Sequence, residues 1–163
     1  MTPVPAAPDI EIDIETGDPA WGDLSGPARL AALRTLAVLS QESDALTPSL
    51  GPVSILLTDD ETVAGLNQQF RGKAGPTNVL SFPAGPNPEG LLGDIALAHG
   101  VCAREADQQG KTLTAHLQHL VAHGVLHLVG YDHITDDEAA VMEDQERRIL
   151  ASLGVADPYA ADA

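Results

Sequence analysis

His123 and His127 stand four residues apart in the middle of an apolar segment. The pattern of that segment, Leu113–Val129, predicts a helix, so the two imidazoles would lie on one face with Cβ atoms about 5–6 Å apart. Gly130 marks the expected helix end, because glycine readily adopts a left-handed backbone. The chain can then reverse and bring His133 toward the pair. Three neutral imidazoles plus water form an open zinc site, which is the catalytic kind.

The spacing of these residues matches the metzincin pattern H-E-x-x-H-x-x-G-x-x-H at its first, fifth, eighth and eleventh positions. The second position differs, because Gly124 replaces the glutamate that serves as general base in zinc peptidases. The segment therefore has the ligand frame of a metalloprotease without its base. We expect one transition metal per chain, with Zn²⁺ favoured.

Three other histidines and one methionine have more ordinary interpretations. His119 lies on the same helical face one turn earlier, and a supporting or structural role is favoured over a fourth ligand. For His116 and His99 we expect only structural roles. Met142 is expected to fill the core, although metzincins place a methionine beneath the metal.

Composition limits the classes of protein to consider. The chain has 163 residues and a mass of 16.9 kDa, which suits one domain, expected over 9–154 between flexible tails at 1–8 and 155–163. Its 24 acidic and 8 basic residues give a net charge of −16, so bulk nucleic acid and anionic membranes would be repelled. The single cysteine, Cys102, excludes an intrachain disulfide and indicates a reduced, cytoplasmic protein. No apolar run is long enough to span a membrane.

Periodicity predicts an α/β fold of the α+β type, with a small mixed four-stranded sheet packed against helices. Ile10, Ile12 and Ile14 alternate with acidic residues, which is typical of an edge strand. Capping boxes begin at Thr58 and Thr135, and Gly154 is an expected helix stop. The expected strands are 9–15, 53–57, 79–82 and 92–98, and the expected helices are 26–42, 58–72, 101–109, 113–129 and 136–153.

The segment from His123 to His133 resembles the hallmark of the YbeY family, the bacterial rRNA-maturation endoribonucleases. Segments 67–71, 76–83 and 92–95 resemble other blocks of that family in the same order, and downstream Met142, Glu146 and 149–150 also fit. The resemblance covers about 53–154. It departs at Asn78, where many members carry aspartate.

This resemblance implies a zincin-like fold whose C-terminal helices hold one zinc ion through His123, His127 and His133. It also implies cleavage of single-stranded RNA, notably at the 3′ end of small-subunit rRNA, and a part in ribosome quality control. The functional arginine of the family would be Arg71.

Chemistry supports a phosphate-binding role for Arg71, because a guanidinium binds phosphate through two parallel hydrogen bonds. Without the family, we would assign it a simple interaction with the helix dipole. The general base stays open, with Asp94 and Asp132 as candidates by chemistry alone.

Two other functions compete with RNA cleavage. A zinc peptidase is supported by the ligand spacing and opposed by Gly124. A ribosome-assembly factor with a structural metal is supported by the charge of −16, since an acidic protein has poor intrinsic affinity for RNA. A ribosomal protein partner would resolve that conflict by delivering the enzyme to its RNA. Neither DNA nor a membrane is an expected partner.

Overall fold

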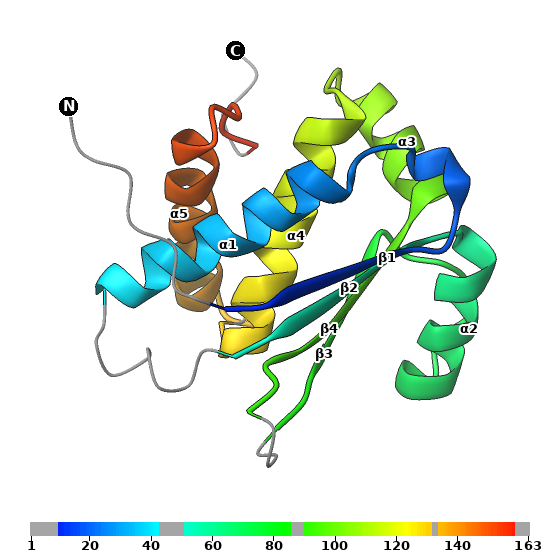
Figure 1. Cartoon of the computed structure of the whole chain (residues 1–163), viewed down its shortest axis with the longest axis horizontal. Coiled ribbons are helices and arrows are strands. Elements are labelled where there is room, and N and C mark those ends of the chain that lie inside the picture. Colours follow the sequence, from blue (N-terminus) through cyan, green and yellow to red (C-terminus); the bar gives the residue numbers. More distant parts are fainter. Residues whose placement is uncertain (1–9, 43–50, 86–89, 132–133, 159–163) are drawn as a thin grey trace.

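A computed structural model of the chain describes residues 10–42, 51–85, 90–131 and 134–158. It has a four-stranded sheet in the order β1-β2-β4-β3 (Figure 1). Strands β1, β2 and β4 are parallel, and β3 runs antiparallel to β4. This mixed sheet confirms the predicted fold class. The strands are β1 (Ile12–Thr16), β2 (Val53–Thr58), β3 (Val79–Pro83) and β4 (Gly93–Ala98).

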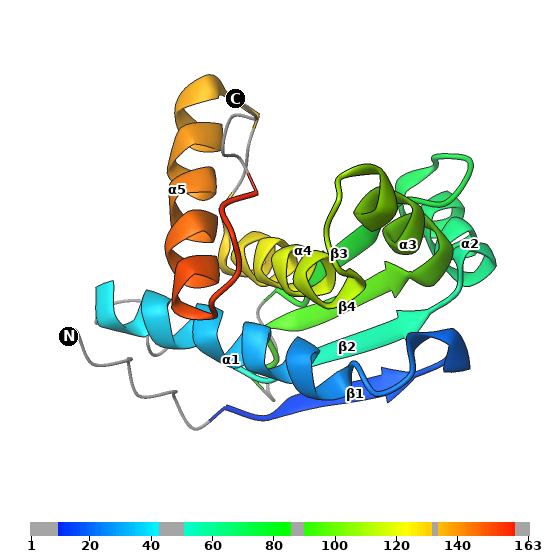
Figure 2. The same cartoon turned by 90° about the horizontal axis from the view of Figure 1, so that it is seen from above.

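Helices cover the two faces of the sheet unequally (Figure 2). On one face α1 (Ser25–Glu42) and α4 (Leu113–Val129) enclose the main core, and α5 (Asp136–Ser152) packs against them from outside. On the other face α2 (Asp60–Arg71) covers a smaller apolar cluster. Helix α3 (His99–Gln108) follows β4 directly, and a short 3-10 helix, η1 (Pro19–Trp21), lies between β1 and α1.

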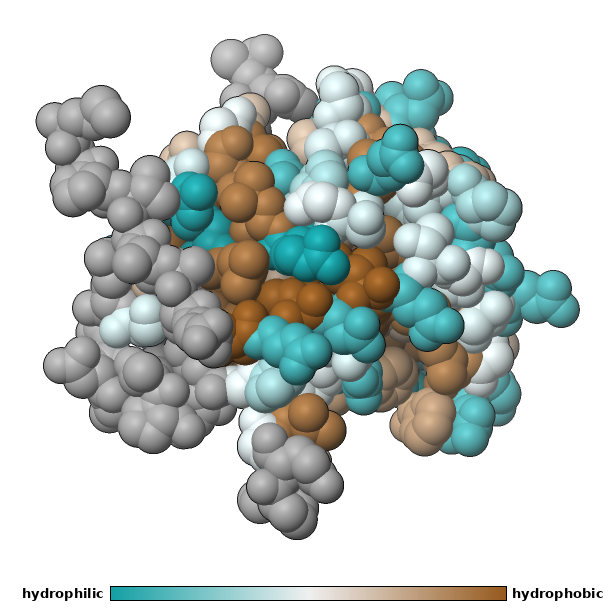
Figure 3. Space-filling view, in the orientation of Figure 1, coloured by the Kyte–Doolittle hydropathy of each residue, from teal (hydrophilic) through white to brown (hydrophobic). Residues whose placement is uncertain are grey.

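The edge strand was predicted from its alternation, and the structure confirms it. Ile12 is buried in the core, whereas Asp13 and Glu15 are exposed on the opposite face. Ile10 and Ile14 are only partly buried against the same core. On the face shown in Figure 3, hydrophobic side chains accordingly gather along β1 and α1 among hydrophilic ones. The prediction of a more buried second strand is also confirmed, because β2 is an inner strand of the sheet.

The first helix-capping prediction was wrong by one residue. Asp59 is the N-cap of α2 and accepts a hydrogen bond from the Thr62 amide. Thr58 instead ends β2 and is buried, with its carbonyl accepting a 2.9 Å hydrogen bond from Trp21 Nε1. Thr58 and Asp59 are both suitable capping residues, and the burial of Thr58 leaves Asp59 to cap the helix.

Other helix boundaries follow local signals closely. Helix α4 has the predicted bounds, and Thr135 and Glu138 form the predicted capping box of α5. Gly154 has a φ of 78° just after α5, as expected of a helix stop. Helix α3 begins two residues earlier than predicted, and η1 was not anticipated.

No helix within the described ranges is long and apolar enough to cross a membrane. The expected tail at 1–8 lies outside the described residues, as does 159–163. Within 155–158, Asp157 forms an ion pair with Arg147 of α5 at 3.2 Å.

Candidate active site

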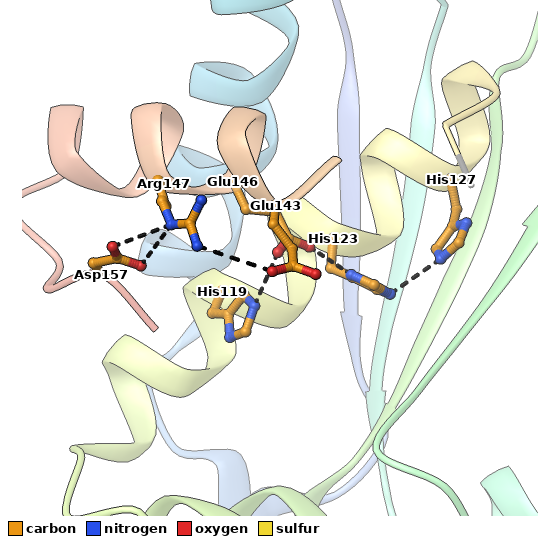
Figure 4. Close-up of polar contacts among 7 residues, drawn as sticks. All are labelled: His119, His123, His127, Glu143, Glu146, Arg147 and Asp157. Carbon is orange, nitrogen blue, oxygen red and sulfur yellow. Dashed lines mark hydrogen bonds and ion pairs between the residues drawn. The ribbon is translucent and has the colours of Figure 1, made fainter. Parts of the chain in front are cut away.

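The side chains of His123 and His127 meet on one face of α4, with their Nε2 atoms 3.0 Å apart (Figure 4). Each Nδ1 atom has an acceptor: the Glu146 carboxylate for His123 at 2.5 Å, and the Tyr131 carbonyl for His127 at 3.0 Å. Neutral rings that donate through Nδ1 carry a lone pair on Nε2. With both Nδ1 atoms donating, both Nε2 atoms would be ligand atoms, and their closeness suits a single cation bound to both.

This geometry fits a zinc site. Two nitrogens bound to one tetrahedral zinc ion at about 2.0–2.1 Å would lie about 3.3 Å apart, close to the observed separation. The third expected ligand, His133, lies outside the described residues, as does Asp132. Accordingly, the described part of the chain contains no group of three side chains suited to a metal. The three-histidine site stays a prediction.

Glu146 fits the family in sequence, but no role in the site was predicted for it. Its carboxylate is completely buried and lies between His123 and His119, whose Nε2 is 3.4 Å away (Figure 4). Carboxylates in this position fix the tautomer and orientation of a metal-binding histidine. The sequence held one usable signal, because Glu146 falls on the same helical face as the buried Met142 and Ile149. Met142 packs in the core, as expected.

A cleft of about 660 Å³ opens beside the histidine pair. It brings Arg71 and Lys73 together with His123 and His127, although the two pairs are far apart in the sequence. No carboxylate is among the described residues that line it. In a chain of net charge −16, such a cleft is suited to an anion.

Arg71 reaches the cleft from the last turn of α2, which ends there because Gly72 adopts a left-handed conformation with φ 66°. Its Nη2 donates a 2.9 Å hydrogen bond to the Ser81 carbonyl on β3. The guanidinium carbon also lies 6.0 Å from the centre of the Phe82 ring. Arg71 is therefore held by two contacts that leave other N–H donors for a ligand.

Gly124, at the position of the peptidase glutamate, faces the sheet. A Cβ atom there would lie 3.0 Å from the Ile95 side chain and 3.1 Å from Ser81 Oγ. The residue is buried at the contact between α4 and the sheet. A glutamate would crowd both neighbours, so the close packing disfavours a general base at this position.

Asn78 and His116 belong to a polar network that centres on Glu105. The Asn78 amide and His116 Nε2 both approach Glu105 Oε1, at 3.0 and 2.9 Å. Burial lowers the pKa of His116, against the raising effect of Glu105. An amide suits this place, because an aspartate would set two carboxylates side by side. Asn78 still lines the cleft, so the family departure lies within the candidate site.

Asp94, one candidate base, lies on the other face of the sheet. It lines a second groove, with Asp13 and Glu15, and is not among the lining residues of the histidine cleft. His99 makes an edge contact with the Trp21 ring, with centroids 5.2 Å apart, which agrees with a structural role.

Comparison with known proteins places this geometry in a family. A family model described as Endoribonuclease YbeY matches residues 28–154. The chain belongs to the YbeY family. Proteins named Endoribonuclease YbeY from Maricaulis maris and Paramagnetospirillum magneticum are 55% and 48% identical to it, over 91% and 92% of this chain and 91% and 96% of theirs.

A solved structure supports the fold of this YbeY family member. The solution structure of TM1509 from Thermotoga maritima matches with a TM-score of 0.57 and 27% identity, over 87% of this chain and 88% of that one. Membership of the YbeY family also implies a metal cofactor. The histidine pair on α4 is the described feature best suited to bind it.

Proposed function

We propose that this protein is a metal-dependent endoribonuclease that cleaves single-stranded RNA with one zinc ion bound by His123, His127 and His133. The single observation that carries the proposal is the cleft, which is lined by the paired imidazoles and by Arg71. The relatives named Endoribonuclease YbeY support the same reaction.

Four of the described residues that line the cleft have distinct tasks in this proposal. A zinc ion bound there would lower the pKa of its water to about 7 and polarise a phosphoryl oxygen. His123 and His127 supply neutral nitrogen ligands, oriented by Glu146 and the Tyr131 carbonyl. Arg71 binds the scissile phosphate and neutralises the charge that develops there. Lys73, which also lines the cleft, adds a second positive charge.

The biological role that we propose is maturation of the rRNA 3′ end and ribosome quality control in the cytoplasm. A net charge of −16 makes strong unaided binding to rRNA unfavourable. We therefore propose that the ribosome or a ribosomal protein positions the enzyme on its substrate.

A zinc peptidase is the weaker alternative, because the position of its catalytic glutamate is occupied by Gly124 and packed against Ile95. An assembly factor with a structural metal is the other alternative. The open cleft beside the histidines favours catalysis over a purely structural metal.

The test measures metal content and hydrolysis with purified protein. We expect one zinc per chain and cleavage of single-stranded RNA, with much slower cleavage of the same sequence as a duplex and none of casein. His127→Ala should lose both the metal and RNA cleavage. Stoichiometric metal in His127→Ala would contradict the ligand assignment, and ribosome association without any RNA cleavage would favour the assembly factor.

A further inference from the structure

The only two phenylalanines of the chain lie together beside Arg71. Phe70 lies in the last turn of α2 and Phe82 lies on β3, with ring centroids 5.4 Å apart and planes at 62°. Phe70 is 60% exposed, so burial in the core does not account for its position. An aromatic pair with one exposed ring and one half-buried ring, next to the arginine proposed to bind phosphate, is a candidate binding surface.

These rings line a second groove, of about 780 Å³, on the face of the sheet that α2 covers. Its apolar part includes Leu56, Leu66 and Ala96. Arg71, Ser81 and Pro83 line both this groove and the histidine cleft. The two hollows therefore meet at Arg71, with the proposed metal site on one side and the aromatic pair on the other.

Charge restricts what can enter this groove. Asp13 and Asp94 stand in one row across the sheet, each beside Ser54, and Glu15 follows on β1. Three carboxylates would repel a phosphate group, whereas Arg71 attracts one. A strand of RNA that crosses this boundary would thus keep its phosphate at Arg71 and turn an uncharged base toward the rings.

We propose that Phe70 and Phe82 form a stacking site for one RNA base next to the phosphate bound by Arg71. Bases stack on aromatic side chains with little dependence on sequence, because every base has an aromatic face. Only an unpaired base can leave its own stack to enter the groove, so the site selects single strands over duplexes. The inference rests on the proposed function, whose substrate selection it explains.

The experiment uses the zinc-loaded protein and a short 2′-O-methyl RNA strand containing 2-aminopurine, whose fluorescence is quenched on stacking. Phe70→Ala should weaken binding by about 10- to 100-fold and abolish the quenching. Phe70→Trp should restore both. The control is Leu30→Ala, which removes an exposed apolar side chain on α1 and should leave binding unchanged.

Cleavage assays with unmodified RNA complete the test. Phe70→Ala should reduce the preference for single strands over duplex while retaining its zinc. If Phe70→Ala keeps the binding, quenching and strand preference of the wild-type protein, the stacking site is refuted. The exposed ring would then be assigned to contact with a protein partner. Failure of the proposed function itself would give a different result, because the wild-type protein would then cleave no RNA, whatever Phe70→Ala does.

Discussion

Both proposed metal-binding imidazoles are oriented through their Nδ1 atoms, but by acceptors of different charge. His127 donates to a backbone carbonyl, whereas His123 donates to the buried carboxylate of Glu146. The anionic acceptor fixes the orientation of the ring and offsets part of the charge of a bound cation.

We therefore expect Glu146→Gln to weaken zinc binding by about 10- to 100-fold, because the amide can still accept the hydrogen bond but carries no charge. Competition with a fluorescent zinc chelator measures the affinity. Glu143→Gln is the matched control, since Glu143 lies on the same helix and contacts Arg147 at 3.9 Å. Equal zinc affinity in the two variants would show that Glu146 has no such role.

Arg71 is expected to act on substrate without supporting the fold or the metal. Arg71→Ala should retain zinc and change the free energy of unfolding by only about 0.5 kcal/mol, because the residue is exposed. It should reduce RNA cleavage far more than Lys73→Ala does, and Arg71→Lys should recover only part of the loss, because lysine lacks the two-pronged geometry. If Arg71→Ala cleaves RNA at the wild-type rate, Arg71 does not bind substrate and is only a charge at the helix end.

At the scale of elements, the contact between α4 and the sheet sets the position of both histidines. Gly124 lies one residue after His123 and packs against Ile95 and Ser81. This close approach holds the histidine-bearing helix against β3 and β4, where the cleft opens.

Gly124→Glu restores the peptidase motif but should not produce a peptidase. We expect it to lower the free energy of unfolding by about 3 kcal/mol or more, through overpacking and an unpaired buried carboxylate. Gly65→Glu is the control, because Gly65 is exposed on α2 and a Cβ there would meet nothing within 4 Å. Denaturant unfolding and a casein assay check both parts; a stable, zinc-dependent protease would refute the prediction.

For the whole molecule, metal binding should contribute to stability, because the proposed ligands and Glu146 connect α4, the segment after it and α5. Free zinc at about 1,000 times its Kd would add about 4 kcal/mol to the free energy of unfolding. Adding a chelator should accordingly lower Tm in the wild-type protein. His127→Ala should show no such shift, and an unchanged wild-type Tm would exclude a stabilising metal.

Much of the fold was predictable because its signals are local. The bounds of α4, the capping box of α5 and the edge strand β1 each depend on residues within a few positions of one another. Periodicity and capping act over that range, and the pairing of His123 with His127 follows from one helical turn.

Long-range packing decided the remainder. The order β1-β2-β4-β3, the meeting of Arg71 with the histidines and the burial of Glu146 join segments distant in sequence. Asp94 shows that local chemistry is not enough to assign a role. A carboxylate suits a general base, but Asp94 lines the groove on the other face of the sheet. A local pattern specifies which face of an element is apolar, whereas the partner of that face depends on how all the elements pack together.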